Sequence, residues 1–140
     1  MEQRRYKAFT LIEMMAVVVI IGILAAVVAP KFFGQVDRAK VVRVSKDIDT
    51  IKQAITLYRF NTGQWPEELR DLAKEPDGVT GWNGPYVENG KFRDPWDNKY
   101  EYRLPGNDGR DFDIWSYGQD GKEGGEGDDA DITSWSDDED

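Results

Sequence analysis

The first thirty residues carry an apolar run that a single acid interrupts. Met14–Ala29 is 16 residues without a charge, and the run counts 21 residues from Phe9 if Glu13 is included. A helix that crosses the hydrocarbon core of a bilayer needs about 20 residues, so the pattern predicts a membrane-spanning helix over residues 9–30. A plain membrane anchor leaves Glu13 unexplained, because a carboxylate inside hydrocarbon raises the free energy of the inserted helix.

Beyond Pro30 the apolar residues become periodic, with spacings of three and four. The stripe consists of Val41, Val44, Ile48, Ile51, Ile55 and Tyr58. This period is typical of an amphipathic helix with one buried face, and Gly63 is suited to the cap at its end. The simplest interpretation is one helix of roughly fifty residues, apolar all round in its first half and one-sided in its second. Two helices with a break at Pro30–Lys31 are the alternative.

The remaining residues predict a small α+β domain that packs on the second half of this helix. Residues 64–72 have a proline and acids near their start and predict a short helix, and residues 77–83 form a glycine-containing loop. Turn residues at 94–98 and 105–109 bound stretches in which apolar side chains alternate. Alternation is the pattern of half-buried strands, so we expect an antiparallel sheet of two or three strands against the long helix.

Composition narrows the functional class. The 140-residue chain has a net charge of −9, and its basic start, with Arg4, Arg5 and Lys7, contrasts with seven acids in its last 13 residues. A negative surface argues against nucleic acid as a partner. The chain contains no cysteine and no histidine, which excludes disulfides and thiolate zinc sites and removes the commonest general base. We therefore expect no enzyme, and the basic start predicts a cytoplasmic N-terminus.

The segment after Trp115 is rich in glycine and acid and permits two interpretations. Calcium takes about six to eight oxygens from carboxylates and backbone carbonyls, and glycine lets the backbone fold around the ion. The alternative is a flexible, solvated tail, although Ile132 and Trp135 return apolar groups directly after the acids and would pin the far end of a loop. The acids do not have the alternate spacing of an EF-hand.

A specific motif stands at the start of the apolar run. The basic leader, the sequence Phe-Thr-Leu-Ile-Glu at Phe9–Glu13 and the apolar helix that follows resemble the type IV pilin and pseudopilin class. The resemblance implies that a prepilin peptidase removes residues 1–8 by cutting between Ala8 and Phe9, and that Phe9 is then N-methylated. The residue before the cut is nearly always glycine in that class, whereas this chain has Ala8.

The same resemblance gives Thr10 and Glu13 a role in assembly. In the class, the glutamate meets the amino terminus of a neighbouring subunit as helices stack into a filament. A carboxylate and an ammonium are each costly in a low-dielectric bundle and offset one another when they pair across subunits. The alternative is that Glu13 lies at headgroup depth and faces water.

The rest of the chain is similar to the major pseudopilin of the type II secretion system. The motifs that carry the similarity are Pro66, Asp94–Trp96, Phe112–Ile114, Ser116–Gly121 and Asp131–Trp135. In that family one calcium ion orders the C-terminal loop. The ligands that the resemblance implies are the carboxylates of Asp120, Asp129 and Asp131 and the backbone carbonyls of Tyr117 and Lys122, with Asp128 as an alternative to Asp129.

The expected protein is a structural subunit that polymerises with its own copies into a periplasmic pseudopilus and supports export of folded proteins across the outer membrane. The resemblance implies a single-pass inner-membrane protein whose partners are minor pseudopilins, the inner-membrane platform and its ATPase. Residues 31–135 would form the periplasmic domain and residues 136–140 a solvated acidic tail. One alternative is a type IV pilin for adhesion, motility or DNA uptake, a class that usually has a disulfide in its C-terminal region. The other is a membrane-anchored calcium-dependent binding module.

Overall fold

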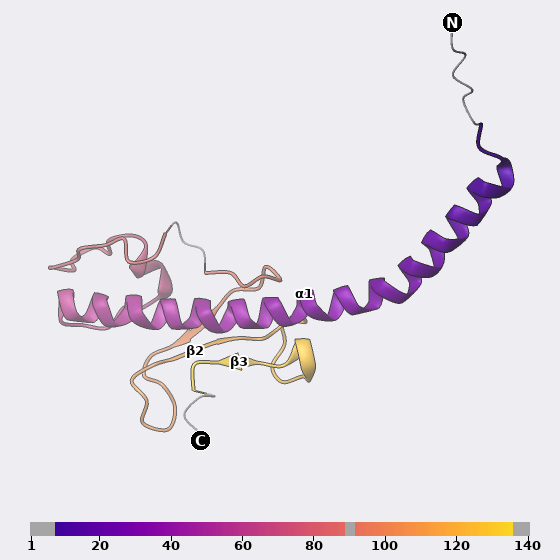
Figure 1. The fold of residues 1–140 in the computed structure, drawn as a ribbon. Helices are drawn as coiled ribbons and strands as arrows, with labels where there is room; N and C mark the ends of the chain where they lie inside the picture. The colour runs from indigo at the N-terminus through magenta and orange to yellow at the C-terminus, as the bar shows by residue number, and fades with distance from the viewer. Residues whose placement is uncertain (1–7, 89–91, 136–140) are drawn as a thin grey trace, which may run out of the picture. The chain divides into compact units, whose positions relative to one another are not determined.

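The computed structural model describes residues 8–88 and 92–135, so most of the predicted leader (1–7) and the acidic tail (136–140) lie outside the described residues. Contacts divide the chain into two units, the first ending at Asp37 and the second beginning at Arg38. The elements are α1 (Leu11–Thr62), η1 (Leu69–Leu72), β1 (Glu101–Arg103), β2 (Asp113–Ser116), η3 (Gly127–Asp129) and β3 (Ile132–Thr133) (Figure 1).

The helix α1 has 52 residues and stays helical through Pro30, so the prediction of one helix is confirmed and the alternative break at Pro30–Lys31 is wrong. It ends where the sequence predicts. Gly63 has a φ of +77°, a left-handed conformation that glycine adopts without steric cost. Its N–H donates to the carbonyl of Arg59 at 2.8 Å, which satisfies one of the last carbonyls of the helix.

In the first unit, the apolar part of α1 covers no core. The 18 residues Leu11–Val28 are long and apolar enough to cross a membrane, and none of them is buried. Leu11, for example, exposes 80% of its surface and Ile23 exposes 61%. An apolar surface of this extent is a site of association with lipid or with another protein.

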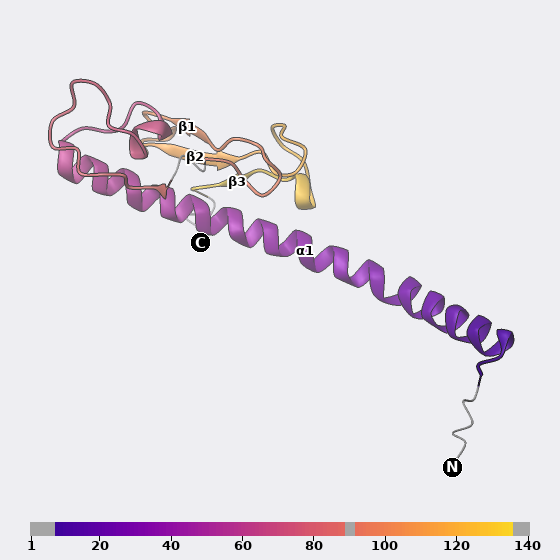
Figure 2. The ribbon, with the colours of Figure 1, turned by 90° about the horizontal axis from the view of Figure 1, so that it is seen from above.

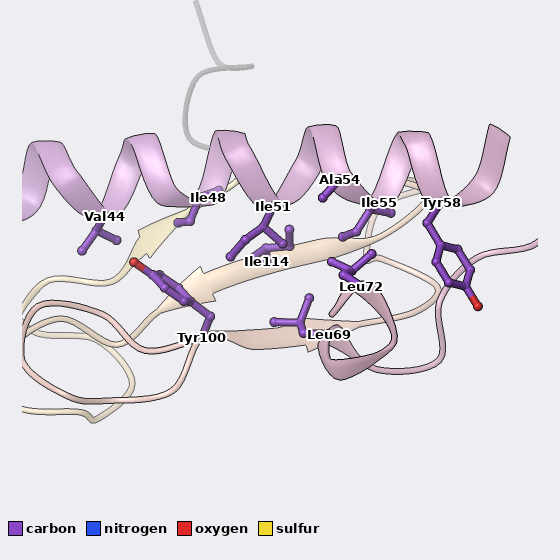
Figure 3. Packing of buried hydrophobic residues seen from close by; sticks show 10 residues of the cluster. All are labelled: Val44, Ile48, Ile51, Ala54, Ile55, Tyr58, Leu69, Leu72, Tyr100 and Ile114. Carbon is purple, nitrogen blue, oxygen red and sulfur yellow. The ribbon is translucent and has the colours of Figure 1, made fainter. Parts of the chain in front are cut away.

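In the second unit, the periodic stripe of α1 forms the core. Figure 3 shows the side chains of this stripe from Val44 to Tyr58 pointing from the helix toward the sheet and toward η1. The buried members of the stripe are Val44, Ile48, Ile51, Ile55 and Tyr58, and Val41 is half-buried. Their partners are Leu69 and Leu72 of η1, Tyr100 just before β1, and Ile114 of β2. The predicted core face is therefore confirmed.

The sheet has three antiparallel strands in the order β1-β2-β3, within the range that the sequence predicts (Figure 2). Tyr102 of β1 lies opposite Ile114, and Ser116 lies opposite Ile132 of β3. Because side chains alternate across a strand, Ile114 and Ser116 share the face that covers α1, whereas Trp115 belongs to the other face.

The predicted short helix over residues 64–72 is mostly wrong, because only Leu69–Leu72 forms a helical turn, of the 3-10 type. The cause is the carboxylate of Asp71, which accepts the N–H groups of Glu67 at 3.0 Å and Glu68 at 3.1 Å. These bonds satisfy the backbone ahead of the turn without extending the helix, so Pro66 lies before the helix and not in its first turn.

Strand β2 also departs from simple alternation, since all four of its residues are buried, including Asp113. The Asp113 carboxylate accepts the backbone N–H of Asn107 at 2.8 Å and the Nε–H of Arg110 at 2.7 Å. Burial by itself would raise the pKa of Asp113, but these hydrogen bonds and the charges of Arg110 and Arg103 outweigh it and hold the pKa below the ordinary value of 3.8. The carboxylate thus closes the turn between β1 and β2.

We predict that Asp113→Asn lowers the free energy of unfolding by about 1–3 kcal/mol near neutral pH, because hydrogen bonds to a charged group are lost. A pKa lowered by folding means that this contribution is complete above the ordinary aspartate pKa of 3.8 and disappears as the pH falls through the lower folded-state value. The difference between variant and parent should shrink in that acidic range. Thermal unfolding of the detergent-solubilised chain over a pH series measures it.

The matched control is Asp108→Asn on the same turn, where the carboxylate is 84% exposed and its nearest Arg110 nitrogen is 3.5 Å away. It should change the free energy of unfolding by no more than about 0.5 kcal/mol. Equal effects of the two substitutions, or an Asp113→Asn difference that persists unchanged into acid, would contradict the assigned role.

Candidate assembly segment and acidic loop

The segment just before α1 is non-helical and exposed. Ala8, Phe9 and Thr10 are non-helical and exposed, with Phe9 78% exposed, and the helix begins at Leu11. The peptide bond between Ala8 and Phe9, the predicted cleavage site, therefore lies in accessible chain. Cleavage at this bond and N-methylation of Phe9 both stay predictions.

Thr10 and Glu13, the two predicted assembly residues, form a hydrogen-bonded cap on α1. The Glu13 Oε2 atom accepts the backbone N–H of Thr10 at 2.8 Å and its hydroxyl at 3.1 Å. In return, the backbone N–H of Glu13 donates to the Thr10 hydroxyl at 3.3 Å. This reciprocal pairing is a capping box, and a Thr followed three residues later by Glu is its sequence signature. The sequence prediction missed this local role.

The cap does not use the whole carboxylate. Both contacts to Thr10 go to Oε2, and Oε1 of Glu13 has no hydrogen-bond partner among the residues that the structure describes. Glu13 is therefore oriented by its own chain and still offers one acceptor oxygen. Local capping and pairing with a neighbouring subunit are compatible.

The acidic loop connects β2 to β3 and contains η3; it lies at the end of the sheet where β2 finishes (Figures 1 and 2). Its two limbs are close together. The N–H of Gln119 donates to the carbonyl of Asp128 at 2.9 Å. A Cβ on Gly118 would lie 2.7 Å from the carbonyl oxygen of Ala130, and Gly118 has a φ of +68°. Both the approach and the conformation require glycine.

The predicted metal ligands are distributed along these limbs. The carboxylate of Asp120 accepts the N–H of Lys122 at 3.0 Å, and the carboxylate of Asp131 accepts the N–H of Gly124 at 3.0 Å through Oδ2. The side chains of Asp120, Lys122 and Asp129 are exposed, whereas those of Tyr117 and Asp131 are half-buried. Within the described ranges, no three acidic side chains form a cluster that could hold a metal ion.

One observation nevertheless fits an oxygen-ligated cation. The Oδ1 atom of Asp131 is buried and has no hydrogen-bond partner in the described part of the chain. A buried carboxylate oxygen without a donor is costly, and a hard cation is one group that would satisfy it. The ligand oxygens available in this loop belong to carboxylates and backbone carbonyls, which are the groups that calcium prefers.

Aromatic residues hold both ends of the loop. Trp115 of β2 contacts the ring of Tyr117 at 6.0 Å and the ring of Trp135 at 6.1 Å, both edge to face. Ile132 belongs to β3, which pairs with β2. The prediction that Ile132 and Trp135 pin the far end of the loop is confirmed. The contribution of Trp115 was not foreseen, because it depends on the pairing of β2 with β3.

Comparison with known proteins agrees with these features. Residues 31–135 match the family model of the type II secretion system, protein G, and residues 3–29 match the prokaryotic N-terminal methylation motif. Among curated proteins, the type II secretion system core protein G of Pseudomonas aeruginosa is 43% identical over 96% of this chain and 99% of its own. The core protein G of Vibrio cholerae is 37% identical over 96% of this chain and 94% of its own.

A solved structure gives the same result for the fold. The crystal structure of the major pseudopilin from the type 2 secretion system of enterohaemorrhagic Escherichia coli matches with a TM-score of 0.61 and 28% identity, over 73% of this chain and 87% of that chain.

An exposed apolar helix, a methylation motif and a small antiparallel sheet on the same long helix define the chain as a pseudopilin, a pilus-like, membrane-anchored subunit. More particularly, the chain belongs to the type II secretion system protein G family. It is a structural subunit of the pseudopilus of that system and not an enzyme.

Proposed function

We propose that the chain is a single-pass protein of the inner membrane that polymerises into a periplasmic pseudopilus. The observation that carries the proposal is the exposure of every side chain over residues 11–28, which a monomer in water would not tolerate. In lipid this surface is solvated, and in a filament it can pack on the same surface of other copies. The basic residues Arg4, Arg5 and Lys7 favour a cytoplasmic N-terminus, which leaves the second unit in the periplasm.

The remaining partners follow from membership of the family. We propose that a prepilin peptidase removes the leader at Ala8–Phe9, and that the membrane platform with its ATPase adds subunits to the filament. Minor pseudopilins would share the filament with this subunit. Support for cleavage comes from the exposed, non-helical backbone at the cleavage site.

Glu13 is proposed to connect subunits by charge. After cleavage, Phe9 carries a free ammonium, and the carboxylate of Glu13 in a neighbouring copy is its natural counterion in a medium of low dielectric constant. Capping by Thr10 fixes the direction of the carboxylate before assembly and leaves Oε1 to accept. Pairing of this kind sets the axial register between adjacent helices.

We also propose that the acidic loop binds calcium through the carboxylates of Asp120, Asp129 and Asp131 and the carbonyls of Tyr117 and Lys122. Asp128 remains the alternative to Asp129. Asp131 is the anchor of this set, because one of its oxygens accepts the N–H of Gly124 and the other is buried with no hydrogen-bond partner among the described residues. A bound cation would supply the positive charge that offsets repulsion among these carboxylates.

We expect cleavage between Ala8 and Phe9, more slowly than in an Ala8→Gly variant, because alanine replaces the smaller residue that the peptidase usually meets. Mass spectrometry of membrane-extracted protein should detect a mature chain that begins at methylated Phe9. Recovery of the full-length chain alone, in cells that still secrete, would refute the proposal.

Two substitutions separate the charge of Glu13 from its capping role. Glu13→Leu removes both functions, whereas Glu13→Gln keeps an oxygen that can accept from Thr10 and removes only the charge. Assembly is measured as the ladder of oligomers that cross-linking produces. If charge pairing fixes the register, both variants should enter the membrane normally but lose most of this ladder. Thr10→Ser should assemble like the parent. A full ladder from Glu13→Gln would mean that Glu13 only caps the helix.

Calcium binding should stabilise the folded chain. The thermal midpoint of the full-length chain in detergent should rise with added calcium, since a ligand that binds only the folded state stabilises it by about 2.7 kcal/mol at a concentration 100 times its Kd. Asp120→Ala and Asp131→Ala should abolish the rise. Asp138→Ala, in the acidic tail, should not change it, and magnesium should substitute poorly because it demands a tight octahedral shell. Identical melting curves in chelator and in excess calcium would disprove calcium binding.

A further inference from the structure

The turn at Asp94–Asn98 has a rigid internal structure. The Oδ1 atom of Asp94 accepts the backbone N–H groups of Trp96 at 3.0 Å and Asn98 at 2.9 Å. The backbone N–H of Asp94 donates to the carbonyl of Asn98 at 2.9 Å, which closes the turn. Asp94 is 5% exposed. An aspartate that accepts hydrogen bonds from the N–H groups of the following residues is a strong turn former, so these bonds fix the shape of the turn.

The same turn contacts the start of the acidic loop through two side chains. The hydroxyl of Ser116, itself fully buried, donates to Oδ2 of Asp94 at 2.7 Å, and the N–H of Gly118 donates to that hydroxyl at 3.2 Å. The side-chain amide of Asn98 donates to the carbonyl of Gly118 at 2.8 Å. A Cβ on Gly121 would lie 2.9 Å from Oδ1 of Asn98, so the loop backbone passes directly beside this amide.

These bonds orient two successive peptide groups. A peptide is planar, so the bond from the N–H of Gly118 to Ser116 also fixes the direction of the Tyr117 carbonyl in the same plane. In the next peptide, the Gly118 carbonyl accepts from Asn98 and the N–H of Gln119 donates to Asp128 on the returning limb. The loop is therefore held between the turn and its own far limb.

We propose that Asp94, Ser116 and Asn98 are positioning residues for cation binding by the acidic loop, an inference that rests on the proposed calcium site. They touch no ion themselves. They hold the Tyr117 carbonyl in one direction and fix the backbone that leads to Asp120. A loop ordered in advance has less conformational entropy to lose when it binds, and residues that orient ligands commonly change metal affinity by about 10- to 100-fold.

The test compares Asn98→Ala with a matched control in the full-length chain in detergent micelles. The control is Asn61→Ala, because the side-chain amide of Asn61 also donates a single hydrogen bond, to the hydroxyl of Tyr86 at 2.9 Å, away from the loop. Titration with calcium chloride in a calorimeter gives Kd. We expect Kd to rise by about 10- to 100-fold in Asn98→Ala and to stay within a factor of two or so in Asn61→Ala, whatever either does to the thermal midpoint.

Amide hydrogen exchange without calcium provides a second readout. In Asn98→Ala, the N–H of Gln119 should exchange faster than in the parent, while amides in the α1 core near Ile55 should keep their protection. If the parent takes up no calcium, the calcium site and this inference both fall. If the parent binds and Asn98→Ala binds equally tightly, or if Gln119 exchange is unchanged, only the positioning role is overturned.

Discussion

Burial of one apolar stripe of α1 is the constraint on which the second unit depends. Fully burying a residue such as Ile48 or Ile55 contributes about 1.5–3 kcal/mol, and Ile114 of β2 is one of the residues that cover these side chains. The position of β2 in turn fixes the positions of the segments that adjoin it in the chain. Ser116 then faces the turn at Asp94, and the acidic loop must leave the sheet at a defined point. The site geometry is thus a consequence of core packing.

The two halves of α1 have surfaces suited to different surroundings, and the function depends on this difference. From Val44 onward it hides one apolar face and exposes mainly polar residues on the other, where Leu57 and Phe60 are the exposed apolar exceptions. Over residues 11–28 it exposes apolar side chains in every direction, which suits lipid or a bundle of like helices. The cap formed by Thr10 and Glu13 lies at the start of that apolar surface. Its charge can specify the axial register between neighbouring helices, which apolar contacts alone specify poorly.

Local patterns in the sequence were sufficient for the long helix, its end at Gly63 and the core stripe, because each depends on neighbours within the chain or on simple periodicity. The length of η1 was predicted wrongly because it depends on which backbone N–H groups donate to the carboxylate of Asp71. The burial of Asp113 and the contacts of Asn98 with Gly118 could not be predicted. They join residues that only the strand register and the closed core bring together.

The central claim is that the apolar half of α1, exposed in the single chain, is buried between copies in the assembled filament. An electron cryo-microscopy reconstruction of the pseudopilus tests it most directly. We expect side chains over residues 11–28 to contact neighbouring copies along the filament axis, with the Glu13 carboxylate at ion-pair distance from the amino group of a neighbouring Phe9. A filament in which these segments stay apart, and only the second units touch, would contradict it.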